Sequence, residues 1–346
     1  MNQLRDHTVK DAGTKSTTTE RERPDQDPVP SHAFRAMALL DVRGLTVTTG
    51  HPETRGTRDF PGAYGQPEVS GVALTLMQGE SLALVGETGS GMTATALAIA
   101  GLLPTNSTVT NGSILFTGQE LVGLTPRAQA RLLGANIGYL PPDLLGSLDP
   151  TRTILSQLGT PLRRRLGLDR PAARERVLKS LARVGLDDPE VVALSYPGDL
   201  SPVVVQRVAV AAALSFDPEL LIAAIPADPA HARPLADLLR LVRALQSKHQ
   251  FALVLVTDDI GVAAECCERI AVLQAGRIVE QGSVSELFES PQHPHTQRML
   301  DARQPYSFGP ADLAPGAAGL VPQVVALHTV DASAFYHGAG VSTLAG

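Results

Sequence analysis

The sequence predicts an α/β fold whose main sheet is mostly parallel and is covered by helices on both faces. Two observations support this prediction. Apolar, strand-like runs alternate with a helical segment in "ELLIAAIPA", "PLADLLRLVRALQSKH" and "FALVLVTDD", an alternation typical of buried parallel sheets. A glycine-rich stretch at residues 86–93, "GETGSGMT", also joins the buried run "SLALV" to the helical run "ATALAIAGLLP". Glycine loops between a strand and a helix commonly bind phosphate groups.

Composition limits the classes of function. The chain has 346 residues, 43% of them hydrophobic, so it is long enough to bury a large core. Its net charge of -6 gives no support for nucleic-acid binding. The two adjacent cysteines, Cys266 and Cys267, are expected to be small helix residues rather than a redox pair. No apolar run reaches the length of a membrane span, so direct membrane insertion is not expected.

The chain divides into three parts by composition. Residues 1–36 are polar and rich in Pro, Thr, Asp and Arg, so we expect them to be disordered. Residues 37–304 carry the alternating pattern, and residues 143–200 within them are helical, charged and poor in strands. The run Arg163-Arg164-Arg165 is expected to lie on a solvated face, with contact to a partner as the alternative. Residues 305–346 are rich in Ala, Gly and Pro and are predicted to form an irregular tail.

Within the central part, local patterns predict individual elements. Residues 38–49 alternate like a strand. Residues 71–86 predict a strand, a turn at Gln78-Gly79 and a second, buried strand. "GSILFTGQEL" predicts a further strand, "SPVVVQRVAVAAALSF" a helix, and "AECCERIAVLQAGRIVEQGS" the end of a helix followed by two strands around Ala275-Gly276.

The glycine loop differs from a typical phosphate-binding loop at one position. Such loops follow the pattern GxxxxGK[ST], and here Met92 occupies the lysine position. A thioether has no charge and no hydrogen-bond donor, and a charge-assisted contact contributes ~1.5–3 kcal/mol. Residual nucleotide contacts are expected through the remaining loop residues, with Thr93 as a Mg²⁺ ligand; the alternative is that the loop is only a turn between strand and helix. The residues are Gly86, Glu87, Thr88, Gly89, Ser90, Gly91, Met92 and Thr93.

The order of several stretches resembles one known family. The stretches are "GESLALVGETGSGMTATALAIAGLLP", "IGYLPPDLLGSLDP", "YPGDLSPVVVQRVAVAAALSFDPELLIA", "VTDDIGVAAECCERIAVLQAGRIVEQG" and "PQHPHTQRML". Together they resemble the nucleotide-binding subunit of ATP-binding cassette (ABC) transporters, in the dipeptide, oligopeptide and nickel importer branch. The resemblance implies an ABC-type P-loop NTPase core with an antiparallel β lobe and a helical subdomain. It also implies ATP and Mg²⁺ as cofactors, permease subunits and a paralogous ATPase as partners, and a cytoplasmic position at the inner face of the membrane.

Two motifs of the family are altered in the middle of the chain. Where the family has a glutamine that senses Mg²⁺ and the γ-phosphate, this sequence has Pro142, which offers no side-chain donor or acceptor. The family signature Leu-Ser-Gly-Gly, which contacts the nucleotide of a partner subunit, retains only Leu200 and Ser201; Pro202 and Val203 replace its glycines. A serine followed by proline still favours a helix start, so capping is the preferred interpretation.

Later motifs lose their chemical groups as well. Ala224 and Ile225 stand where the family has an Mg²⁺-binding aspartate and a general-base glutamate. His231 replaces an interface aspartate, and Asp258 replaces a histidine that contacts the γ-phosphate. The base-stacking aromatic of the family falls on about Thr49. ATP binding is therefore expected to be weak and ATP hydrolysis is not expected, with no catalytic residue and no metal site beyond Thr93.

Three functions remain in view. The first is a non-hydrolysing subunit of an ABC-type peptide importer with a structural or regulatory role beneath a permease. The second is a free-standing cytosolic regulatory protein on the same fold. The third is an active ATPase in which another lysine, Lys248 or Lys179, reaches the phosphates, although neither adjoins a phosphate-facing motif. His293 and His295, in the proline-histidine segment, are expected to be structural rather than metal ligands.

Overall fold

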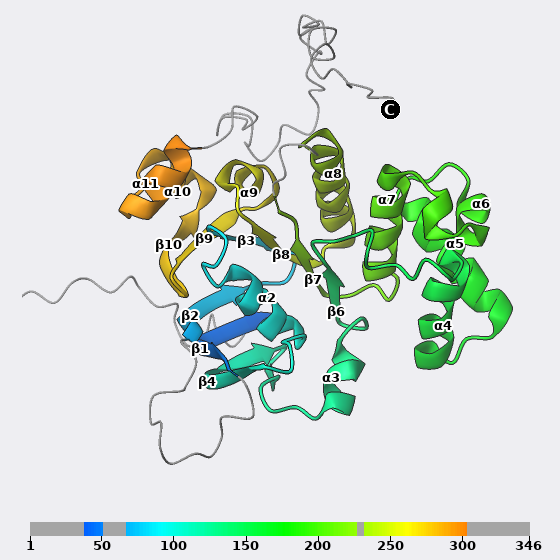
Figure 1. Ribbon diagram of the computed structural model, residues 1–346, viewed down its shortest axis with the longest axis horizontal. Helices are drawn as coiled ribbons and strands as arrows, with labels where there is room; N and C mark the ends of the chain where they lie inside the picture. The colour runs from blue at the N-terminus through cyan, green and yellow to red at the C-terminus, as the bar shows by residue number, and fades with distance from the viewer. Residues whose placement is uncertain (1–37, 51–66, 227–231, 303–346) are drawn as a thin grey trace, which may run out of the picture.

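The computed structural model describes residues 38–50, 67–226 and 232–302, which form two sheets with helices around them (Figure 1). The predictions for residues 1–36 and 305–346 lie outside this part of the chain.

The larger sheet is mostly parallel, as the alternating pattern predicts. Its strand order is β10-β9-β3-β8-β7-β6, and only β10 runs antiparallel to its neighbour. The strand bounds are β3 Ser81–Val85, β6 Ile137–Leu140, β7 Leu220–Ala224, β8 Ala252–Thr257, β9 Arg269–Gln274 and β10 Arg277–Ser283. Because β3, β6, β7, β8 and β9 run the same way, the loops that follow them emerge at the same edge.

The smaller sheet is antiparallel and has the order β2-β1-β4-β5. Its strands are β1 Leu40–Thr49, β2 Pro67–Leu76, β4 Ser107–Phe116 and β5 Gln119–Glu120. Two sequence predictions need correction here. The strand expected from residue 71 begins at Pro67, and "GSILFTGQEL" is not one strand, because Thr117 and Gly118 adopt positive φ values of 48° and 80° and turn the chain between β4 and β5.

The central strands alternate their side chains between two hydrophobic clusters. In β3, Leu82 and Leu84 pack with the antiparallel sheet and α2, whereas Ala83 and Val85 pack on the other face. Both faces are fully buried, which explains why the strand sequences are continuously apolar.

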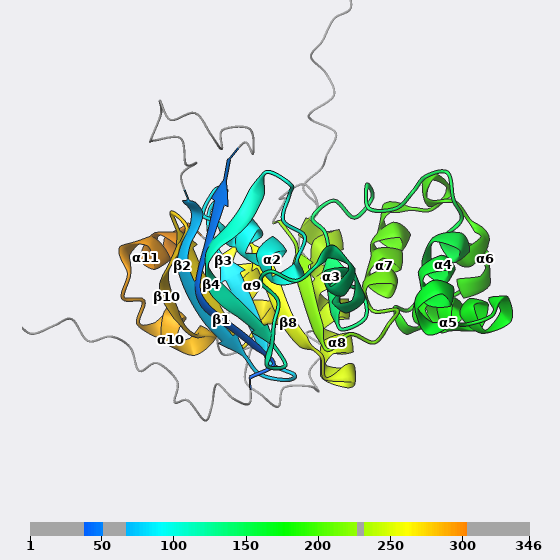
Figure 2. The ribbon, with the colours of Figure 1, turned by 90° about the horizontal axis from the view of Figure 1, so that it is seen from below.

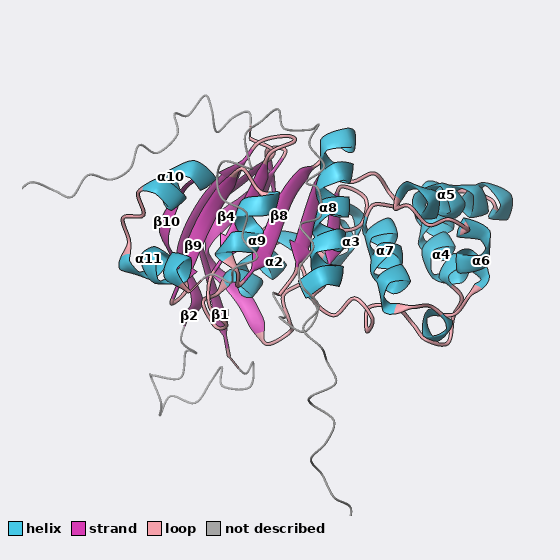
Figure 3. Ribbon diagram, turned by 90° about the horizontal axis from the view of Figure 1, so that it is seen from above, coloured by secondary structure: helices cyan, strands magenta, loops and turns pink. Residues whose placement is uncertain are grey.

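Helices surround the sheets and also form a separate group. The helix bounds are α2 Met92–Ala100, α3 Pro126–Leu132, α4 Ile154–Leu166, α5 Arg170–Arg183, α6 Pro189–Leu194, α7 Pro202–Ala213, α8 Ala232–His249, α9 Ile260–Cys266, α10 Val284–Glu289 and α11 Pro294–Asp301. Helices α4, α5 and α6 gather at one end of the molecule, beyond α7 and away from both sheets (Figures 2 and 3). Helix α3 and strand β6, which were not predicted, follow β5 along the chain.

The two cysteines close helix α9 and are free thiols. Burial raises the pKa of Cys266 to about 12 and holds that of Cys267 well above its usual range. Thiols that stay protonated are poor nucleophiles, so both act as core residues.

The proline-histidine segment is fixed to strand β10 by one carboxylate. Glu280 accepts hydrogen bonds from the backbone N–H groups of Gln292 (2.8 Å) and His293 (3.0 Å), just before α11. His293 caps α11 through its Nδ1, which accepts from the N–H of His295 (3.1 Å), and the His295 ring is buried. These contacts fit the structural interpretation of both histidines.

Glu280→Ala is expected to destabilise the protein by ~1–2 kcal/mol, because two backbone N–H groups lose a charged acceptor that is partly screened by solvent. Burial acts to raise the pKa of Glu280, but the nearby Thr296 hydroxyl and the hydrogen bonds of the Gln292 and His293 N–H groups lower it overall. A carboxyl whose folded pKa is lowered stabilises the fold above its unfolded pKa and loses this effect as pH falls through the folded value. The difference from the native chain in urea unfolding should therefore shrink as the pH falls below the ordinary glutamate pKa of about 4.3. Glu289→Ala is the control, because Glu289 is an exposed glutamate at the end of α10, just before the proline-histidine segment. An equal loss of stability there would contradict this role of Glu280.

Candidate functional site

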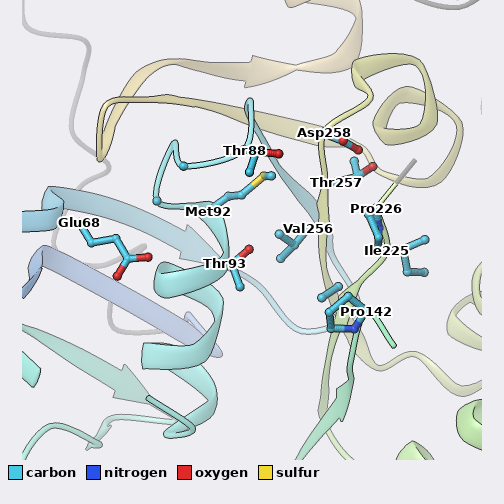
Figure 4. Close-up of a pocket in the computed structure, with 13 residues that line it drawn as sticks. Glu68, Thr88, Met92, Thr93, Pro142, Ile225, Pro226, Val256, Thr257 and Asp258 are labelled. Atoms are coloured by element: carbon cyan, nitrogen blue, oxygen red, sulfur yellow. The ribbon is translucent and has the colours of Figure 1, made fainter. Parts of the chain in front are cut away.

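The loops that follow β3, β6, β7 and β8 surround a cavity of about 250 Å³. This arrangement follows from the parallel sheet, because the carboxyl ends of these strands lie along one edge. The cavity is lined by Glu68, Thr88, Gly89, Gly91, Met92, Thr93, Pro142, Ala224, Ile225, Pro226, Val256, Thr257 and Asp258 (Figure 4). Residues far apart in sequence that we singled out one by one thus face the same space.

The glycine loop is tightly packed against its surroundings. At Gly91, which has φ 95°, a Cβ atom would lie 2.6 Å from the carbonyl oxygen of Glu68. At Gly86, a Cβ atom would lie 2.4 Å from the Ser90 hydroxyl. The carbonyl of Ser90 accepts from the N–H of Gly276 (2.9 Å), which ties the loop to the turn between β9 and β10. Only glycine fits at positions 86 and 91, and this steric restriction maintains the shape of the loop.

Helix α2 directs its N-terminus at the cavity. Gly91 is its N-cap residue, no side chain caps it, and its first turn contains no acidic residue. The N–H groups of the first turn lack intrahelical acceptors, and the helix dipole adds partial positive charge there. Exposed Thr93 lines the cavity beside half-buried Met92. The N-terminus of α2 is therefore a feature of the lining that favours an anion.

The charged side chains of the lining favour the opposite sign. Among the lining residues, which all belong to the described chain, the ionisable ones are the acids Glu68 and Asp258, and there is no lysine, arginine or histidine. Figure 4 shows Asp258 across from Thr88, whereas Glu68 lies on the other side of Met92. A triphosphate in this cavity would meet two carboxylates and no cation.

Glu68 belongs to a polar cluster on the antiparallel sheet. Its Oε2 accepts from the Thr49 hydroxyl (2.8 Å), and the Thr49 Oγ1 is 3.1 Å from the Ser107 Oγ. Thr49 is the residue expected at the base-stacking position. No aromatic side chain lines the cavity within the described residues. The cluster therefore offers hydrogen bonds here but no surface for stacking a base.

The segment around Leu200 and Ser201 lies outside this cavity. Ser201 is the N-cap of α7 and its side chain accepts from the N–H of Val204 (3.5 Å), with Pro202 at the first helical position. Val203 is 43% exposed. This geometry agrees with the capping interpretation of the serine-proline pair.

Other candidate residues lie elsewhere. Lys179 pairs with Glu175 on α5 (2.6 Å), Lys248 sits in the last turn of α8, and neither lines the cavity. His231 falls outside the described residues. Glu68, Pro226, Val256 and Thr257 line the cavity but were not among the predicted site residues; the ends of the apolar runs at β7 and β8 were the available signal for the last three.

Comparisons with known proteins identify the family. A family profile described as "ABC transporter" matches residues 69–224. The chain is 35% identical over 286 residues to the dipeptide transport ATP-binding protein DppD of Haemophilus influenzae, with 83% of each chain covered. It is 37% identical over 269 residues to the oligopeptide transport ATP-binding protein OppD of Bacillus subtilis, covering 77% of this chain and 72% of the relative. The chain belongs to the ATP-binding subunits of ABC transporters.

Solved ABC cassettes confirm the predicted fold class. The structure of cbiO1 from Clostridium perfringens, described as part of the ABC transporter complex cbiONQ, matches with a TM-score of 0.57 and 22% identity, covering 78% of this chain and 96% of that one. A dimeric cassette, MJ0796, solved in a post-hydrolysis state with ADP and Pi, matches with a TM-score of 0.58 and 23% identity over 71% of this chain and 98% of that chain. The fold is therefore that of an ABC-type P-loop NTPase.

The lining of this ABC subunit does not fit Mg²⁺-ATP chemistry. Ala224 and Ile225 are buried at the end of β7 (5% and 3% exposed), and neither can bind a cation or accept a proton. The described residues contain no group of three or more His, Cys, Asp or Glu side chains that could hold a metal ion. Pro142, which also lines the cavity, has no side-chain donor or acceptor. The α2 N-terminus and the Thr93 hydroxyl are the groups of this lining that could face a phosphate.

The described helices have one further property that concerns membranes. None of them combines the length and the apolar character that a membrane-spanning helix requires.

Proposed function

We propose that this chain is a non-hydrolysing ABC subunit of a peptide importer, with a structural or regulatory role beneath a permease. Its relatives named for dipeptide and oligopeptide transport support the importer part. The lining of the cavity, in which apolar and acidic side chains replace every cation, supports the non-hydrolysing part.

The observation that supports this proposal most strongly is that one cavity is lined by Met92, Ala224, Ile225 and Asp258. Each position removes a different requirement: the cation beside the phosphates, the metal ligand, the general base and the histidine at the γ-phosphate. Loss of a general base alone lowers a rate by about 10²–10⁴. The four effects act on one site and are not additive. Pro142 at the same cavity removes a further polar contact.

Any residual nucleotide contact would run through the glycine loop. Gly86, Gly89 and Gly91 keep its backbone shape, and Thr93 offers a hydroxyl to Mg²⁺. ATP and Mg²⁺ are thus weak ligands at best in this proposal. A nucleotide-sensing role would require that this loop alone bind the nucleotide.

The altered signature segment, residues 200–203, favours a structural role over a role in ATP-driven transport. In the proposed assembly a paralogous ABC ATPase is the partner, and each shared site would combine one subunit's glycine loop with the other's signature. Met92 alters this chain's loop, while Pro202 and Val203 alter its signature. Both shared sites would be affected, so the chain is proposed to hold the assembly together at the cytoplasmic face of the membrane. Within it, residues 37–304 would form the nucleotide-binding domain, with residues 143–200 as its helical subdomain.

Co-purification distinguishes this proposal from a free-standing regulatory protein. The tagged full chain is expressed together with the permease subunits and the second ATPase of a peptide importer from the same genome. We expect it to purify with the permease in detergent. Recovery of the chain only as a free protein, while the other subunits assemble without it, would favour the free-standing alternative.

A further inference from the structure

A second cavity lies at the opposite end of helix α2 from the glycine loop. It has a volume of about 280 Å³ and is bounded by the last turn of α2, strand β4, residues 121–124 and helix α3. The start of α2 lines the first cavity, whereas Ala98 and Gly101 line this one. Figures 1 and 2 both show α2, β4 and α3 as neighbours. The proposed role beneath a permease does not use this cavity.

Much of the lining is apolar. Five apolar side chains contribute to it, the first four half-buried and the last fully buried: Leu103, Val109, Leu121, Val122 and Ile114. Every lining residue belongs to the described chain, and none of them is ionisable. A charged ligand would lose hydration here without gaining a counter-ion. The lining therefore favours a neutral ligand with an apolar body.

Uncharged polar side chains supply the rest of the lining. They are Ser107 and Thr108 at the start of β4 and Gln129 on α3. The Gln129 amide lies against the end of α2, because a Cβ atom added at Gly101 would overlap it. Within the described part of the chain this amide has no hydrogen-bond partner. An amide can both donate and accept, so Gln129 can bind a carbonyl or an N–H group of a ligand.

A chain of hydrogen bonds determines what Ser107 can offer. The Thr49 hydroxyl donates its only proton to the Glu68 carboxylate (2.8 Å), and the Thr49 Oγ1 lies 3.1 Å from the Ser107 Oγ. Because the Thr49 proton is already used, the Ser107 hydroxyl is the donor in the second contact. Its oxygen is left to accept, so a ligand that binds Ser107 must carry an N–H or O–H group. The same chain reaches Glu68, which lines the first cavity.

We propose that this cavity binds a small neutral molecule that combines an apolar ring with a hydrogen-bond donor, such as an aromatic primary amide. Ligand pockets commonly start at about 300 Å³, so a cavity of this size suits a molecule with a single ring. The apolar side chains would contact the ring, Ser107 would accept from the donor, and Gln129 would bind the carbonyl. The site is independent of whether the chain hydrolyses ATP.

Binding of benzamide to the full chain, without nucleotide, tests the proposal by saturation-transfer difference NMR. We expect a Kd on the order of 1 mM, as suits a ligand of this size. Ser107→Ala should weaken binding by ~3–10-fold, the effect of one neutral hydrogen bond. Ser113→Ala is the matched control, because Ser113 is also a half-buried serine of β4 but does not line the cavity. It should change the affinity by less than about 2-fold.

Two analogues of benzamide test the chemistry of the ligand. Acetophenone has the same shape but no N–H donor, and benzoate is an anion, so each should bind at least ~3-fold more weakly than benzamide. Val109→Phe tests the position of the site, because the larger side chain would fill part of the cavity and should abolish binding. Urea unfolding of each variant confirms that it is folded.

Four results would overturn the proposal. They are the absence of saturable benzamide binding up to about 10 mM, equal effects of Ser107→Ala and Ser113→Ala, binding of either analogue as tight as that of benzamide, and unchanged binding by a folded Val109→Phe variant.

Discussion

Met92→Lys is expected to tighten Mg²⁺-ATP binding by ~10–100-fold, as measured by calorimetry on the purified chain. Met92 is the first residue of helix α2, and its side chain lines the cavity beside Thr93. The described lining contains no cationic side chain, and a lysine at this position would add one. It would lie next to the N–H groups at the start of α2, which face the cavity. A charge-assisted contact contributes about 1.5–3 kcal/mol, which corresponds to this change in affinity.

Met92→Leu is the control for this substitution, since it changes the shape of the side chain without adding charge. It should bind no better than the native chain. Hydrolysis should stay absent in Met92→Lys, because Ala224 and Ile225 still provide no metal ligand and no base. A native chain that already binds as tightly as Met92→Lys would contradict the assigned effect of the missing cation.

Gly91→Ala is expected to destabilise the fold by about 3 kcal/mol or more, in the absence of any nucleotide. The φ of 95° is unfavourable for alanine, and its Cβ would lie 2.6 Å from the Glu68 carbonyl oxygen and 3.2 Å from the Gly276 Cα. Both neighbours are backbone atoms of ordered strands or turns, so they cannot move aside easily. Urea unfolding measures the change.

Gly89→Ala separates the two causes. Gly89 also has a positive φ, 85°, but an added Cβ would meet nothing within 4 Å. Gly89→Ala should therefore lower the free energy of unfolding only by the cost of a positive φ for alanine, about 1–2 kcal/mol. Equal destabilisation by the two substitutions would show that the contact between the loop and β2 is not what restricts position 91.

The fold class was predictable because its signals are local. The apolar runs of β3, β7 and β8 are continuous since both faces of the sheet are buried, and the glycine loop identifies the turn from β3 to α2. Strand β2 was placed four residues late because Pro67–Ser70 are mostly exposed or half-buried and lack the apolar alternation. The break between β4 and β5 depends on a positive φ at Thr117, which a threonine does not signal.

The site was predictable to the extent that it follows from strand ends. Ile225 and Asp258 come directly after a parallel strand and Pro142 comes two residues after one, so their meeting at one edge follows from the topology. Glu68 was missed because it reaches the cavity from the antiparallel sheet, where its neighbour Thr49 is 19 residues away in sequence. Its position depends on how the two sheets pack, and no local pattern carries that information.

The proposal that this chain does not hydrolyse ATP is tested most directly by measuring phosphate release from Mg²⁺-ATP by the purified chain, with a Thr93→Ala variant prepared in parallel. Thr93 is the candidate Mg²⁺ ligand in the cavity. ATP hydrolysis at this site should therefore require its hydroxyl. The account predicts that the native chain and the variant release phosphate at the same background rate. Turnover by the native chain that Thr93→Ala abolishes would show that this cavity is a working ATPase site and would contradict the account.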